Sequence, residues 1–129
     1  MTVVLANGVF DLLHYGHLLH LEAASRLGDI LVVAVTSDAH VYKPGRPIRP
    51  AYERAALVGA LRCVDQVLVV DGLLDALQKV DVDIVVKGRD YARLEPAHAA
   101  YCKSHGIEIA FTDTPKYSTS DEIRRCKRL

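Results

Sequence analysis

The sequence predicts an α/β fold, namely a doubly wound parallel sheet of five strands with helices on both faces. Apolar runs of strand length recur along the chain, and several are rich in Val and Ile without alternating polar residues, as is typical of strands buried on both faces. Helical patterns lie between these runs, and an alternation of strand and helix indicates a parallel sheet. The predicted strands cover residues 3–6, 30–36, 64–70, 84–87 and 108–111. The predicted helices cover residues 16–27, 51–61, 73–80 and 95–105, followed by a last short helix at 120–127.

Leucine spacing supports the first two helices. Leu18, Leu21 and Leu27 recur at helical intervals in the first, and Leu57 and Leu61 do so in the second. Such spacing places the leucines on one face, which can then pack against the sheet.

The length and composition fit one domain, residues 1–129, with a single hydrophobic core. The 16 basic and 16 acidic residues cancel, which argues against disorder and against a broad nucleic-acid-binding face. The start "MTVVLANG" lacks the features of a secretion signal, and no run approaches the ~20 apolar residues of a membrane span, so we expect a cytoplasmic protein with no membrane partner. Cys63, Cys102 and Cys126 are odd in number and have no C-x-x-C spacing, so we expect reduced structural thiols.

The turn after the first predicted strand carries two glycines and a group of histidines. Gly8 permits a close turn, and Gly16 opens a helix whose free N–H groups favour an anion. The imidazoles of His14 and His17 can donate hydrogen bonds to phosphate oxygens at that helix start. We therefore expect a phosphate site here, and we interpret His20 as a helix-surface residue outside it.

A Pro-rich loop, "YKPGRPIRP" at residues 42–50, follows the second strand at the carboxyl edge of the sheet, where open α/β folds bind ligands. The loop and the following helix supply five cations: Lys43, Arg46, Arg49, Arg54 and Arg62. Taken alone, a charge run is more often a solvated face, but its place beside the first turn favours charge-assisted contacts to a phosphorylated ligand. Arg54 and Arg62 are eight residues apart, slightly over two helical turns, so both are predicted to point to one side.

Two further segments follow the fourth and fifth strands. In "VVKGRDYAR", residues 85–93, Gly88 lets the backbone approach a flat base, Asp90 offers an acceptor for a ribose hydroxyl or an exocyclic amine, and Tyr91 offers an aromatic wall. The alternative is an ordinary Gly/Asp turn. In "KYSTSDEIRR", Thr119 and Glu122 have capping-box spacing, which predicts a structural helix start that is again an anion site.

The stretch "GVFDLLHYGH", residues 8–17, resembles the H-x-G-H signature of the nucleotidyltransferase superfamily that includes the cytidylyltransferases, and the resemblance extends to the last helix. It implies a Rossmann-like sheet, usually in a homodimer, that uses CTP or ATP with Mg²⁺. In the implied reaction a substrate phosphate attacks the α-phosphate and pyrophosphate leaves. Because the attacking phosphate is already ionised at neutral pH, we expect the histidines to stabilise charge rather than to act as a general base.

The resemblance also implies roles for individual residues. Catalytic roles fall to His14, His17 and Lys43, and a role in positioning the metal or the substrate falls to Asp11. Nucleotide-binding roles fall to Gly8, Phe10, Asp11, Gly16, Gly88, Asp90, Tyr91, Ser118, Thr119 and Ser120. Substrate-binding roles fall to Asp38, Arg54 and Arg62. The chain departs from the pattern at Asp113, five residues before Ser118, where an arginine is expected, and Lys116 or Arg124 would have to substitute.

Several substrates are compatible with these motifs. The length and the "LRCVD" arginine favour a glycerol-3-phosphate cytidylyltransferase type, which transfers CMP to a small phosphorylated alcohol. "GRPIRPAYER" and "VKGRDY" resemble the heptose 1-phosphate adenylyltransferases of lipopolysaccharide synthesis, and "KPGRPIRP" with "YSTS" resembles archaeal FAD synthetases. A non-catalytic nucleotide-binding sensor on the same fold is the alternative from another class. The retained pair of histidines argues against it, since a sensor does not need two transition-state donors.

Overall fold

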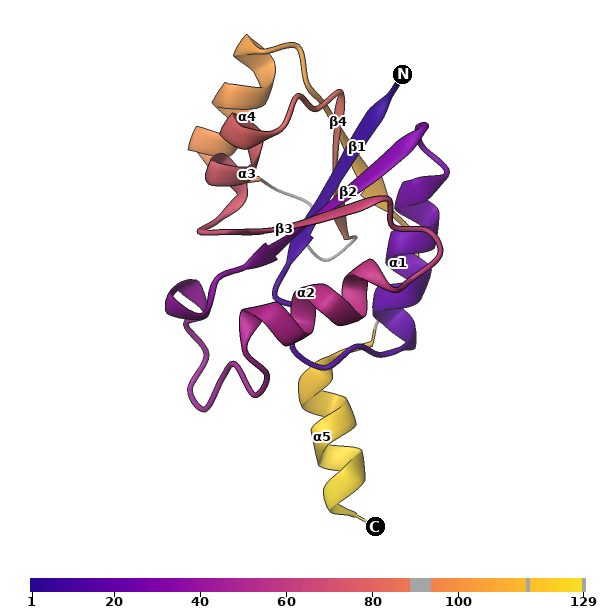
Figure 1. Cartoon of the computed structure of the whole chain (residues 1–129), viewed down its shortest axis with the longest axis vertical. Coiled ribbons are helices and arrows are strands. Elements are labelled where there is room, and N and C mark those ends of the chain that lie inside the picture. The colour runs from indigo at the N-terminus through magenta and orange to yellow at the C-terminus, as the bar shows by residue number, and fades with distance from the viewer. Residues whose placement is uncertain (89–93, 116, 129) are drawn as a thin grey trace.

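The computed structural model describes residues 1–88, 94–115 and 117–128, and these have the predicted α/β architecture (Figure 1). Five parallel strands form one sheet in the order β3-β2-β1-β4-β5. The strands are β1 (Val3–Gly8), β2 (Ile30–Thr36), β3 (Gln66–Val70), β4 (Ile84–Gly88) and β5 (Glu108–Thr112). The helices are α1 (Tyr15–Ser25), α2 (Ala51–Gly59), α3 (Leu73–Lys79), α4 (Pro96–Ser104) and α5 (Thr119–Lys127), with a short 3₁₀ helix η1 (Asp38–His40). This is the Rossmann-like fold that the resemblance implied.

The sheet is wound in both directions from its central strand. Val4 of β1 pairs with Leu31 of β2 on one side and with Ile84 of β4 on the other. The chain therefore proceeds outward through β2 and β3, returns to the centre, and continues outward through β4 and β5. The reversal between β1 and β4 creates a crevice at their carboxyl ends, which is where folds of this kind bind ligands.

Helices cover both faces of the sheet, as predicted. On one face, Leu21 of α1 and Val58 of α2 pack in a core with Val33 of β2. On the other face, Ala76 of α3 and Cys102 of α4 pack in a second core with the β-strands. Successive residues of one strand enter opposite cores, which explains why the strands lack the alternation of a half-exposed sheet.

The region between α2 and β3 differs from the prediction. Helix α2 ends at Gly59 rather than at residue 61, and β3 begins at Gln66 rather than at residue 64. The intervening turn is fastened by Asp65, whose backbone N–H donates to the carbonyl of Leu31 and whose carboxylate accepts from the Leu31 N–H. These bonds replace a further helical turn, and they leave Arg62 outside the helix.

Helix α5 projects from the body of the domain and buries none of its residues completely (Figure 1). Its N-cap is Ser118, whose hydroxyl accepts from the Asp121 N–H at 3.0 Å. The capping interaction therefore lies one residue earlier than the predicted pairing of Thr119 with Glu122. Within the described ranges, no helix combines the length and apolar character that crossing a membrane requires.

Candidate functional site

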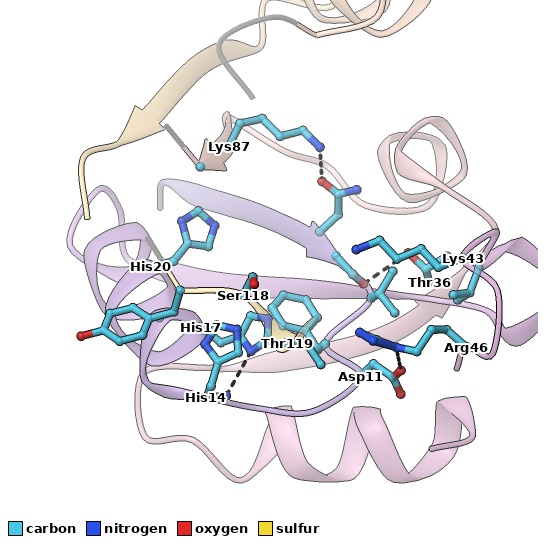
Figure 2. A pocket seen from close by; sticks show the side chains of 18 of the residues that line it. Asp11, His14, His17, His20, Thr36, Lys43, Arg46, Lys87, Ser118 and Thr119 are labelled. Carbon is cyan, nitrogen blue, oxygen red and sulfur yellow. Dashed lines mark hydrogen bonds and ion pairs between the residues drawn. The ribbon is translucent and has the colours of Figure 1, made fainter. Parts of the chain in front are cut away.

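A cavity of about 860 Å³ lies at the carboxyl ends of β1, β2 and β4, beside the start of α1 and the segment that leads into α5 (Figure 2). Its volume falls within the range of small-molecule sites. Only one carboxylate, that of Asp11, is among the described residues that line it. The lining residues are Asn7, Gly8, Val9, Phe10, Asp11, His14, Gly16, His17, His20, Thr36, His40, Val41, Tyr42, Lys43, Arg46, Val86, Lys87, Gly88, Thr114, Pro115, Tyr117, Ser118 and Thr119.

The close approach of the first turn to the α5 segment depends on Gly16. A Cβ atom at this position would lie 2.6 Å from the Cβ of Tyr117 and 2.9 Å from the ring of His14. Phe10 adopts a positive φ of 52° and is buried, with its ring 5.3 Å from that of His17 in an edge-on contact. The turn is therefore tightly packed: Gly16 lies against the ring of His14, and Phe10 lies against the ring of His17.

His14 and His17 form a stacked pair at the start of α1, with ring centroids 3.8 Å apart. The backbone N–H of His14 donates to Nδ1 of His17 at 3.2 Å. Because a backbone N–H can only donate, Nδ1 of His17 is the acceptor, and in the neutral ring the proton must lie on Nε2. This contact presents Nε2–H of His17 as a donor.

Both imidazoles are held in the neutral form. Burial, together with the smaller effects of the neighbouring His14 and His20, lowers the pKa of His17 to about 4. Burial also lowers the pKa of His14, against a smaller opposing effect of Glu122. Nδ1 of His14 is buried and has no hydrogen-bond partner within the described part of the chain. Neutral, oriented imidazoles at a helix N-terminus can donate to a phosphate, and the phosphate site stays a prediction.

His20 was expected on the helix surface, and this expectation is wrong. His20 lines the cavity, and its Nδ1 lies 2.6 Å from Oγ1 of Thr112 at the end of β5. In the sequence His20 is surrounded by leucines, and nothing near it indicates this contact. Only the tertiary fold brings β5 against α1.

Asp11 fastens the loop of residues 42–50 to the first turn. Its side chain is 2% exposed and accepts from Nε of Arg46 at 2.6 Å and from the backbone N–H groups of Ile48 and Arg49 at 2.9 and 3.0 Å. Both carboxylate oxygens are therefore engaged within the protein. This arrangement assigns Asp11 to holding the loop in place, in preference to the predicted metal-positioning role.

Arg54 is completely buried and does not line the cavity, contrary to the prediction that it contacts substrate. Its guanidinium donates to the carbonyl of Val9 at 2.7 Å, to the carbonyl of Arg49 at 2.9 Å and to Oδ1 of Asp38 at 2.6 Å. These bonds join the first turn, the loop and η1. Asp38, likewise predicted at the substrate, is instead the ion-pair partner of Arg54.

Arg62 is exposed and is also absent from the cavity lining. The predicted alignment of Arg54 and Arg62 on one side fails because α2 ends at Gly59, between them. Residues beyond the end of a helix no longer follow its 3.6-residue repeat, so a spacing of eight residues does not place them on one side.

Three other cations reach the cavity. The side chain of Lys43 is exposed and has no hydrogen-bond or ion-pair partner among the residues that the structure describes. The terminal nitrogen atoms of Arg46 likewise lack a described partner, since its bond to Asp11 uses Nε. Lys87, at the end of β4, donates to Oδ1 of Asn7 at 2.7 Å. Asn7 and Lys87 were not predicted as site residues, although their place at strand ends was a usable signal.

The start of α5 contributes its N-cap Ser118 and its first residue Thr119 to the cavity, whereas Ser120 does not line it. Arg124, a possible substitute for the missing arginine, forms an ion pair with Asp121 and does not line the cavity either. Gly88 lines the cavity, and its contact with a base stays a prediction. Lys116, Asp90 and Tyr91 lie outside the described residues.

A parallel sheet with this winding, a cavity at its switch point and a pair of histidines at the first helix are the arrangement expected of the nucleotidyltransferase class. The chain belongs to the cytidylyltransferase-like family, whose sequence model matches residues 5–125.

Curated relatives and solved structures agree with this assignment. The bifunctional protein HldE of Syntrophotalea carbinolica is 40% identical over 130 residues, covering 96% of this chain and 26% of that protein. HldE of Helicobacter pylori is 39% identical, covering 98% of this chain and 28% of that protein. The chain thus spans about a quarter of the length of these relatives.

Among solved structures, a lipopolysaccharide core biosynthesis protein from Thermoplasma volcanium superposes with a TM-score of 0.79 at 31% identity, covering 90% of this chain and 99% of that one. Pantothenate synthetase from Thermus thermophilus superposes with a TM-score of 0.61 at 18% identity, covering 94% of this chain and 58% of that one, which is a likeness of fold alone. The predicted fold and family are therefore confirmed.

Proposed function

We propose that this chain transfers a nucleotidyl group, AMP from ATP in the first instance, to the phosphate of a small phosphorylated sugar and releases pyrophosphate. The observation that carries the proposal is the cavity itself. It combines neutral, oriented imidazoles at a helix N-terminus with the described cations Lys43, Arg46 and Lys87, and its only described carboxylate is already engaged. Such a lining suits a ligand that carries several phosphates.

In the proposed reaction an oxygen of the acceptor phosphate forms a bond to the α-phosphorus. The bond from that phosphorus to the oxygen that bridges to the β-phosphate breaks, and pyrophosphate leaves with the electron pair. The acceptor is ionised at neutral pH, so no residue has to remove a proton. The protein stabilises the charge that accumulates on the phosphate oxygens, and Nε2–H of His17 is a suitably fixed donor for it.

We expect Mg²⁺ to enter this site as a companion of the triphosphate. No group of three or more His, Cys, Asp or Glu side chains that could hold a metal ion occurs within the described ranges. Mg²⁺ commonly keeps several waters and binds through substrate phosphates. When bound it would neutralise phosphate charge, while the described residues supply hydrogen bonds and orientation.

The choice of ATP and a sugar phosphate is supported by two separate likenesses. "GRPIRPAYER" and "VKGRDY" resemble heptose 1-phosphate adenylyltransferases, and the matches to HldE and to a lipopolysaccharide core biosynthesis protein favour the same alternative. This alternative replaces our first hypothesis, CTP with glycerol 3-phosphate. A homodimer stays a prediction.

The test is pyrophosphate release from purified protein with Mg²⁺, each of the four nucleoside triphosphates and a panel of phosphorylated sugars and alcohols. We expect release with ATP and a sugar 1-phosphate, heptose 1-phosphate foremost. Release with CTP and glycerol 3-phosphate would restore the first hypothesis. Tight nucleotide binding without release for any pair would indicate the sensor and overturn the proposal.

A further inference from the structure

The cavity extends beyond the stacked histidines to a polar end that the H-x-G-H motif does not include. This end is formed where α1 approaches the ends of β4 and β5, and it contains His20 and Lys87 (Figure 2), with Asn7 bonded to Lys87. His20 follows His17 by three residues, so the two side chains lie on adjacent turns, displaced by about 4.5 Å along the helix. A ligand held at His14 and His17 can therefore extend one group further and meet His20.

The ring of His20 is fixed by a contact on one side only. Its Nδ1 lies 2.6 Å from Oγ1 of Thr112, and Thr112 is 5% exposed, so the ring is anchored to the sheet. Nε2 has no partner among the described residues. Since His20 lines the cavity, Nε2 is the ring atom that remains for a ligand.

A ligand meets fewer unpartnered cations at this end than at the loop of residues 42–50. Burial lowers the pKa of His20, and the nearby Lys87 lowers it further, so the ring is neutral at pH 7. Lys87 is itself engaged by Oδ1 of Asn7. By contrast, the cations that lack a described partner, Lys43 and the terminal nitrogens of Arg46, come from the loop of residues 42–50.

The group joined directly to the α-phosphate of a nucleoside triphosphate is the ribose. A ribose hydroxyl both donates and accepts, so it can bond to Nε2 of His20 in either tautomer, whereas the edge of a base would require one particular tautomer. We infer that His20 is a specificity-determining residue that binds a ribose hydroxyl of the nucleotide through Nε2. This inference rests on the proposed function for the identity of the ligand.

The test compares ATP with 2′-deoxy-ATP and 3′-deoxy-ATP in the full chain, using His20→Leu and, as a matched control, His98→Leu. His98 lies on α4 and does not line the cavity. We expect the unmodified protein to favour ATP over one deoxy analogue by about tenfold in kcat/KM, the value of one hydrogen bond. His20→Leu should lower kcat/KM for ATP by that factor and leave it unchanged for that analogue, so that the selectivity is lost. His98→Leu should retain it.

A second variant tests the contact that anchors the His20 ring while the ring itself is kept. Thr112→Val removes the anchoring hydroxyl at nearly constant shape, and it should weaken the selectivity while Nε2 is still present. An equal loss for ATP and both analogues in His20→Leu, or no preference for ATP in the unmodified protein, would overturn the inference.

Failure of the proposed function is distinguishable from failure of the inference. If no pair of substrates releases pyrophosphate, calorimetric titration with ATP and the two deoxy analogues replaces the kinetic measurement. Preference for ATP that disappears in His20→Leu supports the ribose contact without catalysis. Equal binding of the three nucleotides, or no binding of ATP, refutes it.

Discussion

Residues 7–20, which comprise the end of β1, the turn after it and the start of α1 and are called the turn below, bring nitrogen donors to the same cavity as the loop of residues 42–50. The two segments hold these donors in opposite ways. The turn presents imidazoles that burial keeps neutral, and His14 and His17 are fixed by stacking and by a backbone hydrogen bond. The loop presents cations, of which Lys43 is exposed. The loop itself is fastened from beneath by two buried charged residues, Asp11 and Arg54.

This difference predicts that the turn and the loop have different roles in the reaction. A fixed neutral donor gains most when charge develops on the atom in front of it, because it needs no rearrangement at that moment. An exposed cation attracts an anion at every stage and is screened by water and salt. We therefore expect the turn to act mainly on turnover and the loop mainly on binding.

His17→Ala should have the largest effect on catalysis. It removes the donor that the His14 N–H orients, so kcat for pyrophosphate release should fall by about a hundredfold or more while the affinity for the nucleotide changes little. Steady-state kinetics and nucleotide titration measure the two quantities. His98→Ala on α4 is the control; equal losses in affinity and turnover for His17→Ala would assign it to binding instead.

Arg54→Met should have the largest effect on stability. It removes the donor from the carbonyl groups of Val9 and Arg49 and separates Asp38 from its partner. We expect the free energy of unfolding to fall by between about 2 and 3 kcal/mol in urea denaturation. Arg62→Met removes an exposed arginine from the turn just beyond α2 and should change the value by less than about 0.5 kcal/mol. Similar values for both variants would show that the hydrogen bonds of Arg54 do not hold the first turn, the loop and η1 together.

Acidification should destabilise the fold through the turn. The pKa of His17 falls from its ordinary 6.5 to about 4 in the folded chain. Between these pH values the unfolded chain binds a proton that the folded chain does not, so the stability is complete above pH 6.5 and is lost as the pH falls toward 4. We expect a loss of about 2 kcal/mol from pH 7 to pH 5. His17→Asn should show a smaller loss and His98→Asn the full one; an unchanged slope in His17→Asn would contradict the burial of a neutral ring.

Lys43→Ala should have the smallest effect of the four. Its cation is exposed and unpaired within the described part of the chain, so kcat/KM should fall by about tenfold at low salt, chiefly through KM, and by less at high salt. Kinetics at two ionic strengths measure this, with Lys103→Ala on α4 as the control. A salt-independent loss confined to kcat would place Lys43 with the turn rather than with the loop.

The sequence was sufficient for the parts of the molecule that depend on local pattern. Uninterrupted Val and Ile runs predicted the five strands, and the spacing of His14, Gly16 and His17 predicted a pair of histidines at the start of α1, where the cavity lies. These features are encoded within a few residues of one another.

Features that depend on distant segments could not be predicted in this way. Arg54 follows the loop as one of several arginines, and only the fold shows that it is enclosed beneath the turn. His20 obtains its role from Thr112, 92 residues further along the chain. The end of α2 was missed because the turn at Asp65 is stabilised by the neighbouring strand rather than by its own sequence.

The central claim is that the turn holds His17 neutral, with its proton on Nε2. Nitrogen NMR of the histidine rings in the labelled full chain measures this most directly, because the shifts of Nδ1 and Nε2 report protonation and tautomer. We predict a neutral ring with the proton on Nε2 at pH 7 and titration near the pKa of about 4. A ring that carries its proton on Nδ1, or that titrates at its ordinary pKa of 6.5, would contradict the account.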